Sequence, residues 1–255
     1  MSFGAIACAP QVEENSRSAV ESEPAPISED AAIATRVDKP DDTADAADAA
    51  DYQPTQDRLE ILMIGPRPDR EPPLQDCGSL KTQQDMNACA YENYQAVDAE
   101  LNEAYQRLKS ALSEDGQQAL VAAELAWLDF RDLDCRLERS QFEGGSIAPL
   151  IHNSCLEART NIRINELYEP VASESSYQAA DSALNSAYQD LAKVINSPRD
   201  ETLLDAQLAW IEYRDRHCEF ETTYGAADLT ADQCKARLSE KRTRQLRAAT
   251  EQNSL

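Results

Sequence analysis

The sequence has few of the residues on which catalytic and metal sites depend. Its 255 residues include only two histidines, His152 and His217, which leaves no plausible catalytic triad. The closest cysteines are twelve residues apart, whereas structural zinc sites pair ligands about two to four residues apart. Motifs for phosphate-binding loops, dinucleotide-binding turns, zinc metalloproteases and EF-hands are also missing. Acids are numerous enough for a paired-carboxylate hydrolase, but acids that recur along helices are normally solvated. We therefore expect no metal, no cofactor and no enzymatic activity.

Positive charge is also scarce. The chain has 47 Asp and Glu residues against 24 Lys and Arg residues, a formal net charge of -23, and each third of it is acidic. Such a polyanion repels phosphate backbones and anionic lipid headgroups, so nucleic-acid binding and polybasic membrane attachment are not expected. A basic protein is the partner that this charge favours.

The N-terminal region has little apolar surface. Residues 1–75 are rich in Ala, Asp, Glu, Pro and Ser, which predicts a disordered acidic tether. Its one apolar run, from Ile61 to Ile64, is far too short to span a membrane. Only seven residues precede Cys8, too few for a signal peptide. Residues Ala5 to Cys8 are similar to the lipobox of bacterial lipoproteins, which implies a lipid anchor on Cys8 as the one route to a membrane. The alternative is a chance cysteine in a disordered tail.

An internal repeat organises the rest of the chain. A shift of 83 residues aligns Tyr94–Glu138 with Tyr177–Glu221 without a gap, and 19 of the 45 positions are identical. Chance would give about three identities, so the chain contains a tandem duplication. After a four-residue deletion, the alignment continues through Cys155 with Cys234, Arg163 with Arg242, and Leu167 with Leu246.

Each repeat shows helical periodicity with almost no Gly or Pro. In the first repeat, apolar residues recur at three- and four-residue steps, which predicts helices from about Tyr94 to Leu112 and from about Gln117 to Leu137. A loop with Gly144, Gly145, Ser146 and Pro149 precedes a third helix from about Ser154 to Tyr168. The predicted fold class is all-α, with two tandem three-helix modules at residues 76–169 and 174–250, each stapled by disulfides.

Six cysteines in the folded part allow fifteen disulfide connectivities. The second repeat keeps only Cys218 and Cys234, which align with Cys135 and Cys155. The simplest assignment pairs them within each module, and this leaves Cys77 to pair with Cys89. Disulfides of this kind indicate an oxidising compartment, so we expect export to the periplasm or the outer cell surface.

The second helix of each repeat carries a recognisable motif. In the second repeat it runs Ala206-Gln207-Leu208-Ala209-Trp210-Ile211-Glu212-Tyr213-Arg214-Asp215 and is followed by Cys218; the first repeat has a variant from Ala123 to Asp132, followed by Cys135. These residues resemble the signature of the lysozyme inhibitor LprI family of small exported or lipid-anchored bacterial proteins. The resemblance covers residues 77–168 well, and residues 177–247 as a second copy that lacks the leading cysteine pair.

The motif itself has a structural interpretation. Trp127, Arg131 and Cys135 share one helical face, as do Trp210, Arg214 and Cys218. Buried arginines need partners, so Arg131 is expected to pair with Asp98, and Arg214 with Asp181. The alternative is that Arg131 pairs with a residue of its own helix or caps backbone carbonyls. Tyr105 and Tyr188 are further positions shared by both repeats.

Two classes of function are consistent with these features. The family resemblance implies a monomeric inhibitor that binds a basic enzyme such as lysozyme. The expected contact surface is the acidic stretch that leads into the glycine loop, namely Asp134, Glu138, Glu143, Gly144, Gly145 and Ser146, because loops insert into clefts more readily than helix faces do. The same stretch also fits a routine loop closed by a disulfide. The second class is a structural or adaptor domain of the cell envelope.

Overall fold

The computed structural model describes residues 67–168, 173–195, 199–225 and 229–254, and these contain helices but no strand. A short 3-10 helix, η1 (Cys77–Ser79), precedes six α-helices. The first repeat forms α2 (Gln83–Ser110), α3 (Glu114–Ser140) and α4 (Ala148–Tyr168), and the second forms α5 (Tyr177–Val194), α6 (Arg199–Tyr224) and α7 (Ala231–Asn253). The all-α prediction and the two tandem three-helix modules are therefore confirmed.

Local sequence signals fix where several helices begin. The side chains of Thr82, Ser113 and Ser176 each accept a hydrogen bond from a backbone N–H in the first turn of the helix that follows. Thr230 and Gln233 form a complete capping box at the start of α7. Helix α4 begins at Ala148, earlier than the expected start near Ser154, and Pro149 lies in its first turn, where a missing N–H costs nothing.

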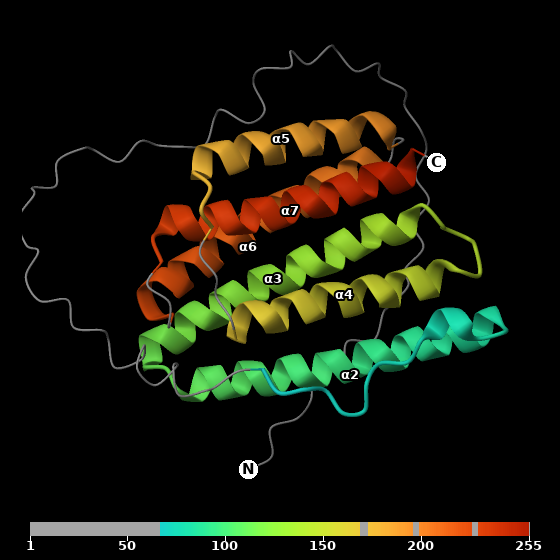
Figure 1. Cartoon of the computed structure of the whole chain (residues 1–255), viewed down its shortest axis with the longest axis horizontal. Helices are drawn as coiled ribbons and strands as arrows, with labels where there is room; N and C mark the ends of the chain where they lie inside the picture. The colour runs from blue at the N-terminus through green and yellow to red at the C-terminus, as the bar shows by residue number, and fades with distance from the viewer. Residues whose placement is uncertain (1–66, 169–172, 196–198, 226–228, 255) are drawn as a thin grey trace, which may run out of the picture. The chain divides into compact units, whose positions relative to one another are not determined.

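The two modules pack together through their second helices. Helix α3 makes its most extensive contact with α6, while α2 packs mainly on α4, and α5 mainly on α7 (Figure 1). Helices α3 and α6 run antiparallel. Arg199 at the start of α6 donates a hydrogen bond to Ser140 at the end of α3 (3.0 Å), and Phe220 near the end of α6 clusters with Leu120 near the start of α3.

An approximate two-fold axis relates the two modules. Phe130 and Tyr213 occupy equivalent positions in the repeat, and their rings stack in parallel with centroids 5.9 Å apart. Equivalent residues that touch each other lie on such an axis, as in an isologous dimer interface. One hydrophobic core cluster contains both tryptophans and residues of both modules. Each module thus completes the core of the other.

The three disulfides join the expected pairs. Cys77–Cys89 links η1 to α2, Cys135–Cys155 links α3 to α4, and Cys218–Cys234 links α6 to α7. In the last two, 20 and 16 residues separate the paired cysteines, and closing such a loop contributes about 3 kcal/mol in the chain-entropy model. Each module therefore has one covalent bond between its second and third helices.

The chain just before η1 is held against the helices. Arg67 and Arg70 both bind Glu100 of α2, with N–O distances of 2.6 and 2.8 Å, and both donate to the side-chain oxygen of Asn161 in α4. Residues 67–75, expected to belong to the disordered tether, therefore pack on the first module. The expectations for Cys8 and for Ile61 to Ile64 lie outside the described residues. No helix in the described ranges is long and apolar enough to cross a membrane.

Candidate functional site

In each module the arginine of the signature stacks on the tryptophan, and we call this pair the stacked column. The Arg131 guanidinium lies 5.1 Å from the centre of the Trp127 ring, and Arg214 lies 5.4 Å from Trp210. Both expected pairings of Arg131 occur: Asp132 of the same helix lies at 2.8 Å and Asp98 of α2 at 3.6 Å. The second module repeats this pattern, with Asp215 at 2.9 Å and Asp181 at 3.9 Å from Arg214. The shorter contact is within the helix, and Asp98 and Asp181 remain partly exposed.

Two further arginines, Arg163 in α4 and Arg242 in α7, are almost completely buried at the interface between the modules. The repeat places them at equivalent positions, and each lies over the central aromatic ring of the opposite module. Arg163 is 5.3 Å from the Tyr213 ring, and Arg242 is 5.0 Å from the Phe130 ring. These arginines hold the two modules together, and sequence reasoning did not single out their role.

The partners of Arg163 form a buried polar network. Its guanidinium binds Glu124 at 2.7 Å, the Tyr213 hydroxyl at 3.2 Å and Nδ1 of His217 at 3.0 Å. The Tyr213 hydroxyl donates to Glu166, which also binds Lys241 at 3.0 Å. Burial raises the pKa of Tyr213 well above 10.0, and the carboxylate of Glu166 acts in the same direction.

The electrostatics of this network keep His217 neutral. Burial lowers the pKa of His217 well below 6.5, and the nearby cations Arg163, Arg237 and Lys241 lower it further. Burial alone would raise the pKa of Glu166, but Lys241 and Arg163 outweigh burial and hold this pKa below 4.5. A neutral imidazole beside Arg163 offers that cation a ring nitrogen as acceptor without adding charge.

Arg242 has a different set of partners at the equivalent place. It binds Asp134 at 2.7 Å and Gln207 at 3.2 Å, and Gln207 aligns with Glu124 in the repeat. Asp134 also accepts a hydrogen bond from Nε of Arg159 at 2.6 Å, and Nη2 of Arg159 donates to Glu138. Together Arg242 and Arg159 outweigh the effect of burial and lower the pKa of Asp134 below 3.8.

This arrangement removes Asp134 from the predicted partner surface. Asp134 is 3% exposed and fully engaged inside the molecule, so it cannot contact another protein. Glu138 is partly exposed but is bound to Arg159. The loop residues Glu143, Gly144, Gly145 and Ser146 do lie on the surface. The loop is tied to α2 by a hydrogen bond from Asn87 to the Ser146 carbonyl (3.0 Å), and Gly144 has a positive φ of 76°, which favours glycine.

The structure presents a different exposed surface on α3 and α6. Leu125 is 59% exposed and its repeat equivalent Leu208 is 56% exposed, with Leu204 one turn away at 49%. The approximate two-fold axis runs perpendicular to the antiparallel pair α3 and α6. Equivalent residues of these two helices therefore lie on the same side of the helix pair. We call this surface the leucine face. It also holds exposed or half-buried acids, namely Asp129, Asp132, Asp205, Glu212, Asp215 and Glu219.

The acids of the leucine face differ in how strongly they are engaged. Asp132 and Asp215 bind the signature arginines, and Glu212 binds Arg216. Asp129 and Asp205 are exposed and form no ion pair with any residue in the described ranges. A signal for this surface was present in the sequence, since Leu125 and Leu208 stand two residues before each tryptophan and therefore point away from the core.

Among the residues that the structure describes, two groups of side chains are spaced closely enough to hold a metal ion: His217 with Glu221 and Cys234, and Asp134 with Glu138 and Cys155. The sulfur atoms of Cys234 and Cys155 are in disulfides, so neither can supply the thiolate that a metal binds. The carboxylates of both groups bind arginines instead. The donor chemistry of these groups does not fit a metal site.

Two equivalent three-helix units, each with a disulfide between its second and third helices, define an all-α disulfide-bonded repeat protein. The family model described as lysozyme inhibitor LprI matches residues 75–167 and 171–246. This chain belongs to the LprI family, and it contains two copies of the family's module.

Two individual proteins are also similar to this chain. The chain is 32% identical over 125 residues to an uncharacterized protein, R02472, of Rhizobium meliloti (strain 1021), a match that covers 44% of this chain and 90% of that protein. A crystal structure of an uncharacterized protein from Burkholderia thailandensis is similar in fold, with a TM-score of 0.51 and 17% identity. That match covers 70% of this chain and 94% of the other.

Proposed function

We propose that this protein is an exported binder of a strongly basic protein such as lysozyme, that it blocks its target, and that it uses the leucine face. The observation that carries the proposal is the pair of exposed leucines at equivalent positions, on a face where six exposed or half-buried acids outnumber the exposed Arg136 and Arg216. A few well-packed side chains near the centre of an interface supply most of the binding energy, and surrounding charges supply orientation and specificity.

Charge is distributed unevenly among the helices. Helices α3 and α6 each have seven acidic residues and three arginines, whereas α7 has three acidic and six basic residues. The negative potential is therefore concentrated on the helix pair that carries the leucine face. A field of this sign accelerates the encounter with a cationic enzyme.

The three disulfides support the proposed location. They fit an oxidising compartment such as the periplasm or the outer cell surface, and the family contains inhibitors of an extracellular enzyme. Lipidation at Cys8 would keep the protein attached to a membrane. Mass spectrometry of the protein purified from its native membranes tests this, since an unmodified N-terminus upstream of Cys8 would exclude the anchor.

A lysis-inhibition assay with c-type lysozyme at physiological salt tests the proposal. We expect inhibition at micromolar protein, and at least a tenfold loss for the double variant Leu125→Ala with Leu208→Ala, because a central interface side chain is worth about 1–2 kcal/mol or more. Leu80→Ala is the matched control, since Leu80 is an exposed leucine outside this face. Circular dichroism checks that the variants stay folded.

Two outcomes would contradict the proposal. Absence of inhibition by the wild-type protein at micromolar concentration would favour a structural or adaptor role in the cell envelope. Inhibition that the double variant retains in full, and that disappears above about 0.5 M salt, would indicate only non-specific charge pairing.

A further inference from the structure

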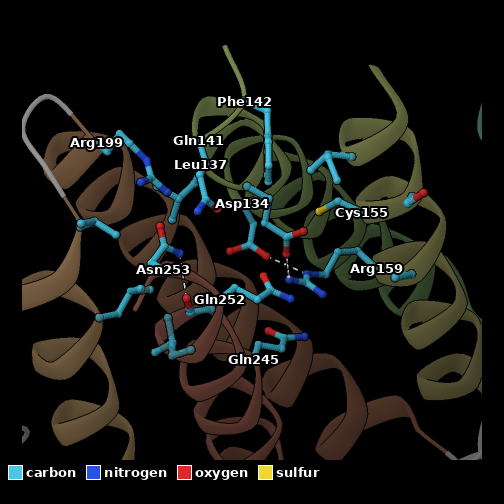
Figure 2. Close-up of a pocket in the computed structure, with 18 of the residues that line it drawn as sticks. Asp134, Leu137, Gln141, Phe142, Cys155, Arg159, Arg199, Gln245, Gln252 and Asn253 are labelled. Atoms are coloured by element: carbon cyan, nitrogen blue, oxygen red, sulfur yellow. Dashed lines mark hydrogen bonds and ion pairs between the residues drawn. The ribbon is translucent and has the colours of Figure 1, made fainter. Parts of the chain in front are cut away.

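One end of the molecule contains a cavity of about 460 Å³. It lies among the ends of α3, α5 and α7 and the starts of α4 and α6, and Figure 2 shows its lining. We call four of its apolar residues, Leu137, Leu191, Ile195 and Leu246, the apolar wall; Phe142, Ile151, Ala158 and Ala249 also line it. The volume is within the range of about 300–1,000 Å³ that is typical of small-molecule sites.

The repeat supplies an internal comparison for this cavity. The residues equivalent to its apolar wall are Phe220, Leu108, Leu112 and Leu167, and in the other half these pack together as a hydrophobic cluster. Phe220 also packs beside Tyr224, with ring centroids 6.5 Å apart. The cavity side has the smaller Leu137 in place of Phe220, and Gln141 in place of Tyr224. The rings of Phe220 and Tyr224 therefore have no equivalent on the cavity side, where Phe142 is the aromatic residue of the lining.

The cavity also has a positive lining in a strongly acidic protein. It is lined by Arg159, Arg199 and Arg242, against the two acids Asp134 and Glu138. Arg159 binds both of these acids. Arg199 occupies the position of Gly116 in the repeat and donates only to Ser140 among the described residues, without a carboxylate partner.

The cations in this lining are incompletely compensated. Partial burial lowers the pKa of Arg199. Burial also lowers the pKa of Arg242 in spite of Asp134, and its Nη2 atom has no hydrogen-bond partner in the described structure. An anion in the cavity would stabilise the charged form of Arg199. In Figure 2 the Arg199 side chain points toward Leu137 and Gln141.

We propose that this cavity binds a small amphipathic carboxylate. The carboxylate pairs with Arg199, whose guanidinium can donate to both oxygens, and Gln141 offers an additional amide donor. The hydrocarbon chain lies against Leu191, Ile195 and Leu246. The positive potential of the nearby Arg242 favours the anion over an uncharged molecule of the same shape.

Titration calorimetry of the full chain with sodium octanoate and with 1-octanol tests this site. We expect saturable binding of one octanoate per chain, at least tenfold tighter than that of octanol, because a charge-assisted bond distinguishes the two. Arg199→Gln should bring octanoate to the affinity of octanol. Arg136→Gln is the matched control, because it removes an exposed arginine of α3 that does not line the cavity.

A second variant uses the repeat itself to fill the cavity. Leu137→Phe combined with Gln141→Tyr introduces the residues found in the other half, and it should abolish binding of both ligands while the melting temperature is retained. Equal affinities for octanoate and octanol, or no saturable binding at millimolar ligand, would overturn the proposal. Unchanged octanoate binding in a folded filled variant would do the same. If the filled variant does not fold, the Arg199→Gln and octanol comparisons still decide.

Discussion

Replacing Asp134 by Asn tests whether this acid stabilises the fold or binds a partner, as its position in an acidic stretch predicts. The carboxylate is 3% exposed and accepts from two guanidinium groups, Arg242 at 2.7 Å and Arg159 at 2.6 Å. Asn keeps one acceptor oxygen but no charge. Arg159 retains Glu138 as a partner, whereas Arg242 keeps only neutral Gln207 and Gln245.

The expected cost follows from the buried charge that remains. Removing one partner of a buried ion pair typically costs about 3–5 kcal/mol, because the other charge is left without compensation. For a folded part of this size, 1 kcal/mol shifts the melting temperature by roughly 2–4 °C, so Asp134→Asn should lower it by roughly 6–20 °C. The loss should appear in the free energy of unfolding at neutral pH.

Urea unfolding, followed by the fluorescence of the buried Trp127 and Trp210, measures this loss. Asp129→Asn is the control, because Asp129 is an exposed acid of the same helix, and its replacement should change stability by less than about 0.5 kcal/mol. If Asp134→Asn were as stable as this control, the buried network would not hold the modules together. Folded Asp134→Asn should also inhibit lysozyme like the wild type, since the side chain is not accessible to a partner.

The other predictions concern the stacked column, the buried histidine and the disulfides. Arg214→Ala should cost about 1–3 kcal/mol in urea unfolding, because it removes the stack on the tryptophan, whereas Arg216→Ala on the exposed side should be nearly neutral. Equal stabilities of these two variants would contradict the stacking role. His217 has a folded-state pKa far below its unfolded value of about 6.5, so the unfolded chain binds the extra proton. Wild-type stability should therefore fall as the pH decreases below about 6.5, by at most about 1.4 kcal/mol per pH unit, relative to His217→Gln. Replacing Cys135 and Cys155 together by Ser should cost about 3 kcal/mol, measured by thermal unfolding against the wild type under oxidising conditions, and the difference should vanish in reductant.

Much of the fold could be predicted because its signals are local. Helical periodicity, capping residues and cysteine positions are all read within one module, and the repeat provided each module twice. The packing of α3 on α6 could not be predicted this way, because an apolar stripe shows which face is buried but not what covers it. The stacking of Phe130 on Tyr213 depends on that packing.

The candidate site was harder to predict, and Asp134 shows why. An acid in an acidic helix resembles a solvated residue, so the sequence predicts Asp134 on the partner surface. However, Asp134 follows Trp127 by seven residues, or two helical turns, which places both on the same buried face. The charges that balance it, on α4 and α7, are distant in sequence, so only the folded chain shows the pairing.

The contact between α3 and α6 has a consequence for how this chain behaves on dilution. Two separate copies of one module would associate through this surface only above a certain concentration, whereas joined copies meet intramolecularly at a fixed, high effective concentration. Joining also frees the two sides to diverge. In a symmetric pair every substitution would occur twice, but here Asp134 faces Arg242 on one side while neutral His217 faces Arg163 on the other. Gene duplication and fusion thus gave one half an open cavity and the other a filled core.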